Sequence, residues 1–279
     1  MSAHPSFEDV TDIIRNVAAA EILPRFRCLS SGDIREKSGP GDLVTVADVE
    51  AERALTAALT ALAPGSVVVG EEGVEEAPER LDTLAGPGPI WVVDPVDGTG
   101  NFAAGNPCFA VIVAYVVGGE TVVGWIHDPI NDITAVAAKG EGAWIGRDRL
   151  QVSPAKPVAE MTGSAPRRVR ERVARLDGVN GTAVPGHLMQ WRCTGQEYLA
   201  MAQGRLDFVR YGRRLKPWDH AAGILIHAEA GGYSALVGPR GGAREPEPYS
   251  PAGGIRSGVL LAAADRESWA ALKPTMIDA

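Results

Sequence analysis

Acidic residues follow several apolar segments of this sequence, at points where strands or helices are expected to begin or end. Glu71 follows SVVVG, Asp94 follows WVV and Asp219 follows KPW, with Glu72 and Asp97 close to the first two. Because ligands gather beyond the carboxyl ends of parallel strands, we expect these side chains to meet at one edge of a sheet. Carboxylates brought together repel one another unless a cation neutralises them. Oxygen ligands suit Mg²⁺, Ca²⁺ or Mn²⁺, so the pattern predicts a site for a hard divalent cation.

Each acid, taken alone, also fits a turn or a helix cap. Asp94 and Asp97 together are better explained as metal ligands, because they follow a buried strand and precede Gly98 and Thr99. The turn Gly98-Thr99-Gly100 leads into a short helix and exposes backbone N–H groups, which with the helix dipole favour an anion such as phosphate. Divalent cations beside a phosphate site predict metal-assisted hydrolysis, in which one ion activates water and a second stabilises the leaving oxygen.

The surrounding sequence predicts the elements that hold these residues. Apolar periodicity indicates helices over residues 7–26, 49–62, 196–203 and 219–230. Two β-rich runs flank Gly118-Gly119, which is a hairpin signal. The polar residues 75–89, rich in Gly and Pro, are predicted to be a loop that includes at most a turn of helix. Helices come first, then a run of strands, then alternating strands and helices. This order predicts a layered α+β fold.

Composition limits the classes of protein and partner. The chain has 279 residues, a net charge of −8 and no run of Lys or Arg, which argues against direct nucleic-acid binding. Its cysteines, Cys28, Cys108 and Cys193, lack CxxC spacing and suit a reducing compartment. The N-terminus has no signal-peptide pattern, and the apolar runs are too short to span a bilayer. We therefore expect a cytoplasmic protein with no membrane or nucleic-acid partner.

Five motifs occur in order: DLVTVAD at residues 42–48, GEEG at 70–73, WVVDPVDGTGNF at 91–102, PWDHAAG at 217–223 and EAGG at 229–232. Together they resemble the inositol monophosphatase family, part of a larger group of magnesium-dependent, lithium-sensitive phosphatases, over nearly the whole chain. The resemblance implies an αβαβα sandwich, as in fructose-1,6-bisphosphatase, forming a single phosphatase domain of two lobes. Residues from about 1 to 150 would hold most of the metal site, and residues from about 151 to 279 would cover the substrate. It also implies a homodimer.

The same resemblance implies a set of metal ligands. Glu71, Asp94 and the backbone carbonyl of Val96 would hold one ion. Asp94, Asp97 and Asp219 would hold a second, so that Asp94 bridges the two. Glu71 would also act in catalysis and lie near a weaker third ion. The ion would be Mg²⁺, with Mn²⁺ as a substitute and with Ca²⁺ and Li⁺ as inhibitors.

Other residues would act on water and phosphate. By the resemblance, Thr99 and Asp48 would orient the attacking water, and the amides of Gly98 and Thr99 would bind phosphate. Lys37 is either a supporting residue near the metal site or a solvated loop residue.

The sequence departs from the family where the substrate is recognised. Inositol monophosphatases carry a glutamate that hydrogen-bonds sugar hydroxyls, and Gly212 takes its place here, seven residues before Asp219. Arg213 and Lys216 would suit a second phosphate or another acidic group, or would form a solvated basic turn. Glu197 would replace the missing carboxylate, bind an amine, or simply begin a helix.

These observations predict a Mg²⁺-dependent phosphomonoesterase that acts on a small phosphorylated metabolite resembling inositol 1-phosphate. Histidinol phosphate, fructose 1,6-bisphosphate and 3′-phosphoadenosine 5′-phosphate are alternative substrates. A regulatory binding protein that retains the phosphatase fold is an alternative of another class, and a structural Ca²⁺ site is a third. The complete set of acids, together with Thr99, favours the enzyme.

Overall fold

Two large sheets and a two-stranded sheet organise the chain in the computed structural model, which describes residues 4–37, 43–176, 181–239 and 245–278. Asp42, the first residue of the DLVTVAD motif, lies outside these residues. The small sheet pairs β1 (Ile34–Glu36) with β2 (Leu43–Thr45).

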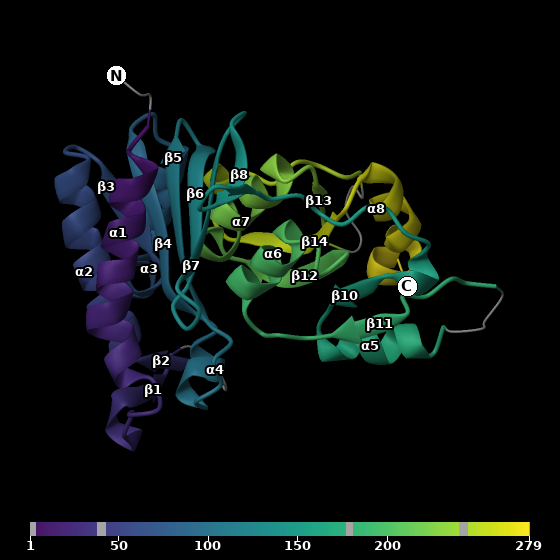
Figure 1. Cartoon of the computed structure of the whole chain (residues 1–279), viewed down its shortest axis with the longest axis horizontal. Coiled ribbons are helices and arrows are strands. Elements are labelled where there is room, and N and C mark those ends of the chain that lie inside the picture. The colour runs from purple at the N-terminus through teal and green to yellow at the C-terminus, as the bar shows by residue number, and fades with distance from the viewer. Residues whose placement is uncertain (1–3, 38–42, 177–180, 240–244, 279) are drawn as a thin grey trace.

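Helices cover the faces of the two large sheets in layers (Figure 1). The outer face of the seven-stranded sheet carries α1 (Phe7–Val17) and α2 (Val46–Leu62). Between the sheets lie α6 (Thr194–Ala202) and α7 (Pro217–Glu229), and beyond the five-stranded sheet lie α5 (Arg167–Ala174) and α8 (Arg266–Lys273). The order helix, sheet, helix, sheet, helix confirms the predicted αβαβα sandwich.

The seven-stranded sheet has the order β3-β4-β5-β6-β7-β8-β9. Its strands are β3 (Val67–Gly70), β4 (Pro89–Asp97), β5 (Ala110–Val117), β6 (Glu120–Asp128), β7 (Ile133–Ala138), β8 (Gly142–Ile145) and β9 (Asp148–Arg149). Strands β3 and β4 are parallel, and every later neighbour is antiparallel. Gly118 and Gly119 have φ angles of 59° and 78° and form the predicted turn between β5 and β6. The parallel pair ends at the edge where two of the acids stand.

The five-stranded sheet has the order β11-β10-β12-β14-β13. Its strands are β10 (Thr162–Ser164), β11 (His187–Met189), β12 (Phe208–Leu215), β13 (Tyr233–Val237) and β14 (Arg256–Ala263). Helix α7 connects this sheet to the first, since it follows β12 in the chain and packs on β6. A Cβ atom at Gly124 would lie 2.8 Å from the Cα atom of Ala222, so glycine is required at this close approach.

The N-terminal helices follow the predicted periodicity with two differences. The helix predicted over residues 7–26 is α-helical only to Val17 and continues as a π-helix (Ala18–Ile22) and a 3₁₀-helix (Leu23–Arg25). Pro24 lies in that last turn, where its ring prevents the regular helix from continuing. Helix α2 begins three residues earlier than predicted, because the side chain of Thr45 caps it.

Residues 75–89 contain more helix than the single turn that the sequence predicted within a loop. They contain the end of α3 (Glu71–Glu76) and a 3₁₀-helix (Pro78–Ala85) whose Leu84 is buried. Glu71 therefore begins a helix. None of the helices in the described residues is long and apolar enough to cross a membrane.

Candidate active site

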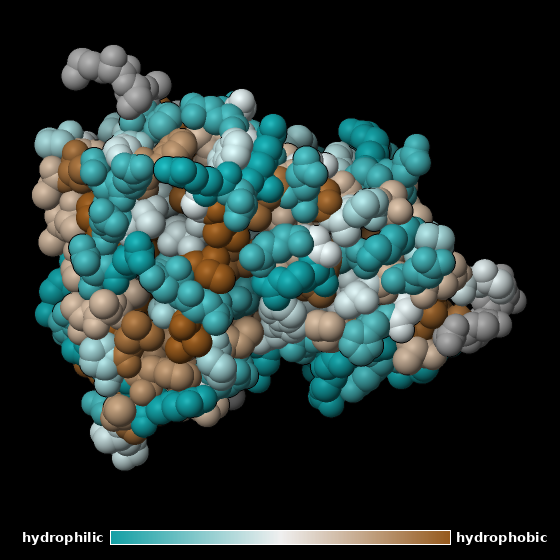
Figure 2. Space-filling view, viewed as in Figure 1, coloured by the Kyte–Doolittle hydropathy of each residue, from teal (hydrophilic) through white to brown (hydrophobic). Residues whose placement is uncertain are grey.

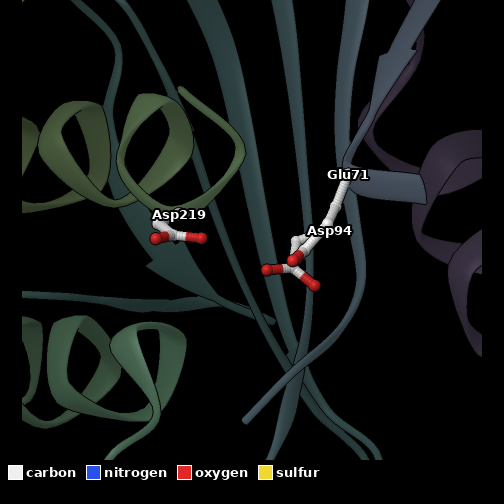
Figure 3. A group of neighbouring side chains, drawn as sticks. All are labelled: Glu71, Asp94 and Asp219. Atoms are coloured by element: carbon white, nitrogen blue, oxygen red, sulfur yellow. The ribbon is translucent and has the colours of Figure 1, made fainter. Parts of the chain in front are cut away.

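Three acids from separate segments converge at the carboxyl ends of β3 and β4. The two strands are in parallel register, with Gly70 opposite Val93, so Glu71, directly after β3, lies level with Asp94 of β4. Asp219 lies in the first turn of α7 and reaches the same point from the other side (Figure 3). One carboxylate oxygen from each of the three residues lies within 4.8 Å of the others. The predicted convergence of these acids is therefore present in the structure.

The acid cluster Glu71–Asp94–Asp219 is electrostatically strained. Burial, followed by the charge of Glu71, raises the pKa of Asp94 well above its ordinary value. Burial likewise raises the pKa of Asp219, and the charges of Glu71 and Asp97 add to the effect. A divalent cation would relieve this repulsion, because its charge stabilises the ionised carboxylates. The donor set, oxygen only, fits a hard cation.

Two lysines contact the acid cluster through Glu71. The Nζ atom of Lys216 lies 2.8 Å from Glu71 Oε1, and that of Lys37 lies 3.1 Å from the same oxygen. Lys37 also lies 2.6 Å from Glu72 Oε1. Burial alone would raise the pKa of Glu71, but Lys216 and Lys37 bring it below its ordinary value. Lys37 is thus placed beside the acids, and Lys216, predicted from the sequence as a substrate contact, pairs with Glu71.

Asp97 lies beside the acid cluster but turns toward α6. Its Oδ2 atom accepts a hydrogen bond from the backbone N–H of Gly195 at 2.6 Å and one from the thiol of Cys193 at 3.0 Å. Residues three apart point to opposite faces of a regular strand. The pairing of β4 with β5 is irregular between Asp94 and Asp97, and this bulge lets both carboxylates lie on the side that α6 and α7 cover. No pattern in the sequence indicated the contacts of Cys193 and Gly195.

Asp48 and Thr99 form a hydrogen-bonded pair next to the acids. Thr99 Oγ1 lies 3.0 Å from Asp48 Oδ1 and 3.0 Å from the carbonyl oxygen of Val96. The other carboxylate oxygen of Asp48 accepts hydrogen bonds from the backbone N–H and hydroxyl group of Thr45, at 2.8 and 2.6 Å. Burial raises the pKa of Asp48 to about 6, although the bonds from Thr45 oppose it. The capping box of α2 therefore fixes the carboxylate that faces Thr99.

Gly98 shapes the turn that presents Thr99. Its φ angle is 90°, in the left-handed region, and a Cβ atom there would lie 3.0 Å from the carbonyl oxygen of Cys108. Only glycine meets both requirements at low cost. The short helix α4 (Thr99–Ala103) begins directly after it, with Gly98 as its N-cap.

A cavity of about 230 Å³ adjoins the acids and is lined in part by Asp97, Asp219 and Glu197. Glu197 is buried and accepts hydrogen bonds from the hydroxyl group of Ser164 and, at 3.3 Å, from the backbone N–H of Trp191. Burial raises the pKa of Glu197 to about 7. Gly212 lines the same cavity, whereas Arg213 lines a neighbouring one.

Comparisons with known proteins agree with this geometry. The sequence profile of the inositol monophosphatase family matches residues 8–267. The chain is 36% identical over 241 residues to the inositol-1-monophosphatase SuhB of Mycobacterium tuberculosis (strain ATCC 25618 / H37Rv), covering 83% of this chain and 81% of that protein. It is 31% identical over 210 residues to the fructose-1,6-bisphosphatase/inositol-1-monophosphatase of Thermotoga maritima, covering 72% and 73%.

Comparison with solved structures also indicates the inositol monophosphatase fold. The solved structure of an IMPase from Thermotoga maritima superposes with a TM-score of 0.76 at 25% sequence identity, covering 96% of this chain and 95% of that one. The match therefore includes both large sheets. With the family profile and the named relatives, it shows that the chain is a phosphoric monoester hydrolase that belongs to the inositol monophosphatase family.

Proposed function

We propose that this enzyme removes phosphate from a small phosphorylated metabolite with the help of Mg²⁺. The observation that carries the proposal is the convergence of Glu71, Asp94 and Asp219, whose ligand oxygens lie within 4.8 Å of one another. A compound resembling inositol 1-phosphate is the first candidate substrate. Histidinol phosphate, fructose 1,6-bisphosphate and 3′-phosphoadenosine 5′-phosphate are the alternatives. The names of the two relatives support an inositol phosphate and, for the Thermotoga protein, a sugar bisphosphate.

The proposed ligands are those implied by the sequence motifs. Glu71, Asp94 and the carbonyl of Val96 would hold one ion, and Asp94, Asp97 and Asp219 a second. The raised pKa values of Asp94 and Asp219 support this assignment, since a cation makes their ionised forms favourable. Bound Mg²⁺ would supply the charge that activates water and stabilises the leaving oxygen. Mn²⁺ is proposed as a substitute, and Ca²⁺ and Li⁺ as inhibitors.

The side chains of Thr99 and Asp48 would orient the attacking water. In this proposal the Thr99 hydroxyl donates a hydrogen bond to Asp48 Oδ1, 3.0 Å away, and keeps its proton. The Thr99 oxygen can then accept a hydrogen bond from water, which leaves a water lone pair free to attack phosphorus. The amides of Gly98 and Thr99 would hold the phosphate oxygens.

Phosphate release tests the proposed function. Purified protein with Mg²⁺ is expected to hydrolyse at least one of the four candidate substrates, and excess EDTA is expected to abolish the activity. Asp94→Asn should be inactive while it keeps its fold. Failure of the wild-type protein on all four substrates, with bound metal verified, would contradict the assignment of substrate class.

Several broader expectations remain part of the proposal. We propose a cytoplasmic homodimer in which residues from about 1 to 150 form the metal-binding lobe and residues from about 151 to 279 form the substrate-covering lobe. Light scattering on the purified protein distinguishes a dimer from a monomer.

A cellular phenotype that survives Asp94→Asn would favour the regulatory alternative, because that role would need the fold and not the hydrolysis.

A further inference from the structure

A second, larger cavity lies next to the candidate catalytic cavity. Its volume is about 820 Å³, and it lies among α5, β12 and β14. The two cavities share the lining residues Pro166, Gln190, Arg210 and Gly212. These shared residues make the two cavities direct neighbours, with Arg210 and Gly212 between them. A volume of this size accommodates the body of a metabolite in addition to a single phosphate group.

The larger cavity is lined by basic residues. Its arginines are Arg167, Arg168, Arg172, Arg210 and Arg213, and no acidic residue occurs among the described residues that line it. The guanidinium of Arg172 donates to the carbonyl of Thr275 at 3.2 Å, and that of Arg210 donates to the carbonyl of Met276 at 3.3 Å. Arg168 and Arg213 are exposed. The surface over α5 is strongly hydrophilic in Figure 2.

Arg210 occupies space that a side chain at position 212 would need. A Cβ atom at Gly212 would lie 2.4 Å from Arg210 Nη1 and 3.1 Å from its Cζ atom. Any residue larger than glycine would displace the guanidinium. Both residues line both cavities, so a positive charge stands at the boundary between them.

Arg213 is held in an uncommon backbone conformation. Its φ angle is 76°, a left-handed value that few residues other than glycine adopt and that strains the backbone. It pairs with Gly258 of β14, and both residues line the larger cavity. In a regular strand the side chains of Arg213 and its neighbour Gly212 would point to opposite faces. The left-handed backbone instead accompanies an arginine that lines the same cavity as Gly212.

We propose that this arginine-lined cavity binds a second phosphate group on the substrate. The inference rests on the proposed function, because the first phosphate would be the one hydrolysed. Guanidinium groups bind phosphate through paired, charge-assisted hydrogen bonds, and several of them around one cavity favour a dianion over a neutral polyol. The enzyme therefore prefers a metabolite with two separated phosphates to its monophosphate counterpart.

The test compares matched substrates that differ by one phosphate. The pairs are fructose 1,6-bisphosphate with fructose 1-phosphate, and adenosine 3′,5′-bisphosphate with adenosine 3′-monophosphate. We expect kcat/KM to be higher for the bisphosphate in at least one pair. In the double variant Arg168→Ala/Arg213→Ala, the bisphosphate-to-monophosphate ratio of kcat/KM should fall by about tenfold or more. Arg175→Ala removes an exposed arginine outside the cavity and should leave the ratio unchanged.

Two outcomes would overturn the inference. One is a double variant whose ratio matches that of Arg175→Ala, and the other is equal loss on both members of each pair, which indicates a structural role. If no substrate is hydrolysed, calorimetric titration of each bisphosphate into the Asp94→Asn protein still tests whether the arginines bind phosphate. Binding that is about tenfold weaker after Arg168→Ala/Arg213→Ala supports the subsite even though the proposed function has failed. Absence of binding, or binding that the arginines do not affect, contradicts it.

Discussion

The hydroxyl oxygen of Thr99 lies 3.0 Å from a carboxylate oxygen of Asp48, although 51 residues separate the two in the chain. The contact joins the first turn of α2 to the first residue of α4. It depends on Thr45, whose backbone and side chain hold the other oxygen of Asp48. A helix cap and a candidate catalytic pair are therefore parts of one hydrogen-bond network.

Thr99→Ala should reduce kcat by about 100-fold or more with little change in KM, because the water loses the group that orients it. Thr99→Ser keeps the hydroxyl group and is the matched control, so it should retain most of the activity. Steady-state phosphate release measures both. A Thr99→Ala enzyme with wild-type kcat would remove Thr99 from the proposed mechanism.

Asp94→Asn should make the metal-free protein more stable. The substitution removes one of three mutually repelling carboxylates, and Asn can still accept the hydrogen bond that Val96 N–H donates to Asp94 Oδ1 at 3.1 Å. We expect Tm in EDTA to rise by about 2–4 °C, which corresponds to about 1 kcal/mol. Mg²⁺ should raise the Tm of the wild-type protein and have little effect on the variant. Thermal unfolding with and without Mg²⁺ gives all four values, and a lower Tm for the variant in EDTA would show that Asp94 stabilises the metal-free fold more than its repulsion destabilises it.

Gly98→Ala should lower both stability and kcat. The new methyl group meets the carbonyl oxygen of Cys108 at 3.0 Å while the backbone keeps a φ of 90°. Gly65 is the matched control, since its φ is 88° and nothing lies within 4 Å of a Cβ atom built there. Gly65→Ala should cost about 1 kcal/mol of unfolding free energy from backbone strain alone, and Gly98→Ala should cost more. Equal costs, measured by urea denaturation, would show that the contact with Cys108 relaxes freely.

The buried side chain of His227 should make the stability of the fold sensitive to acid. The imidazole is fully buried in α7, and burial lowers its pKa to about 4. An unfolded histidine titrates near pH 6.5, so between about pH 6.5 and 4 the unfolded state binds a proton that the folded state does not. Stability from this group is therefore complete above pH 6.5 and is lost as the pH falls toward 4, by up to about 3 kcal/mol.

Urea denaturation at pH 7.5 and pH 4.5 measures this effect. His227→Leu should show a smaller loss of unfolding free energy between the two pH values than the wild-type protein. The same substitution at the exposed His187 serves as the control. An unchanged pH dependence in His227→Leu would assign the acid sensitivity to other groups.

The elements that position the acids could be predicted because their signals are local. Apolar runs mark β3 and β4, and the glycine pair 118–119 marks the hairpin between β5 and β6. Strands β10 and β11 are three residues each and could not be found in this way. Their pairing depends on partners far along the chain, and so short a segment carries too few residues to show a period.

The candidate site was predictable in its residue types more than in its contacts. The motifs indicated that Glu71, Asp94 and Asp219 would meet. They did not indicate that Lys216 pairs with Glu71, or that Arg210 fills the space beside Gly212. Each of these contacts depends on the direction of the side chain and on which segments the fold brings together. The spacing of residues in the sequence predicts neither of these two factors.

The central claim is that carboxylates from three separate segments hold the divalent ions that the hydrolysis needs. Anomalous X-ray scattering from crystals grown with Mn²⁺ tests it most directly. We predict anomalous peaks bonded to Asp94 at about 2.0–2.2 Å, one shared with Glu71 and one with Asp219. An active protein whose crystals show no Mn²⁺ among Glu71, Asp94 and Asp219 would contradict the claim.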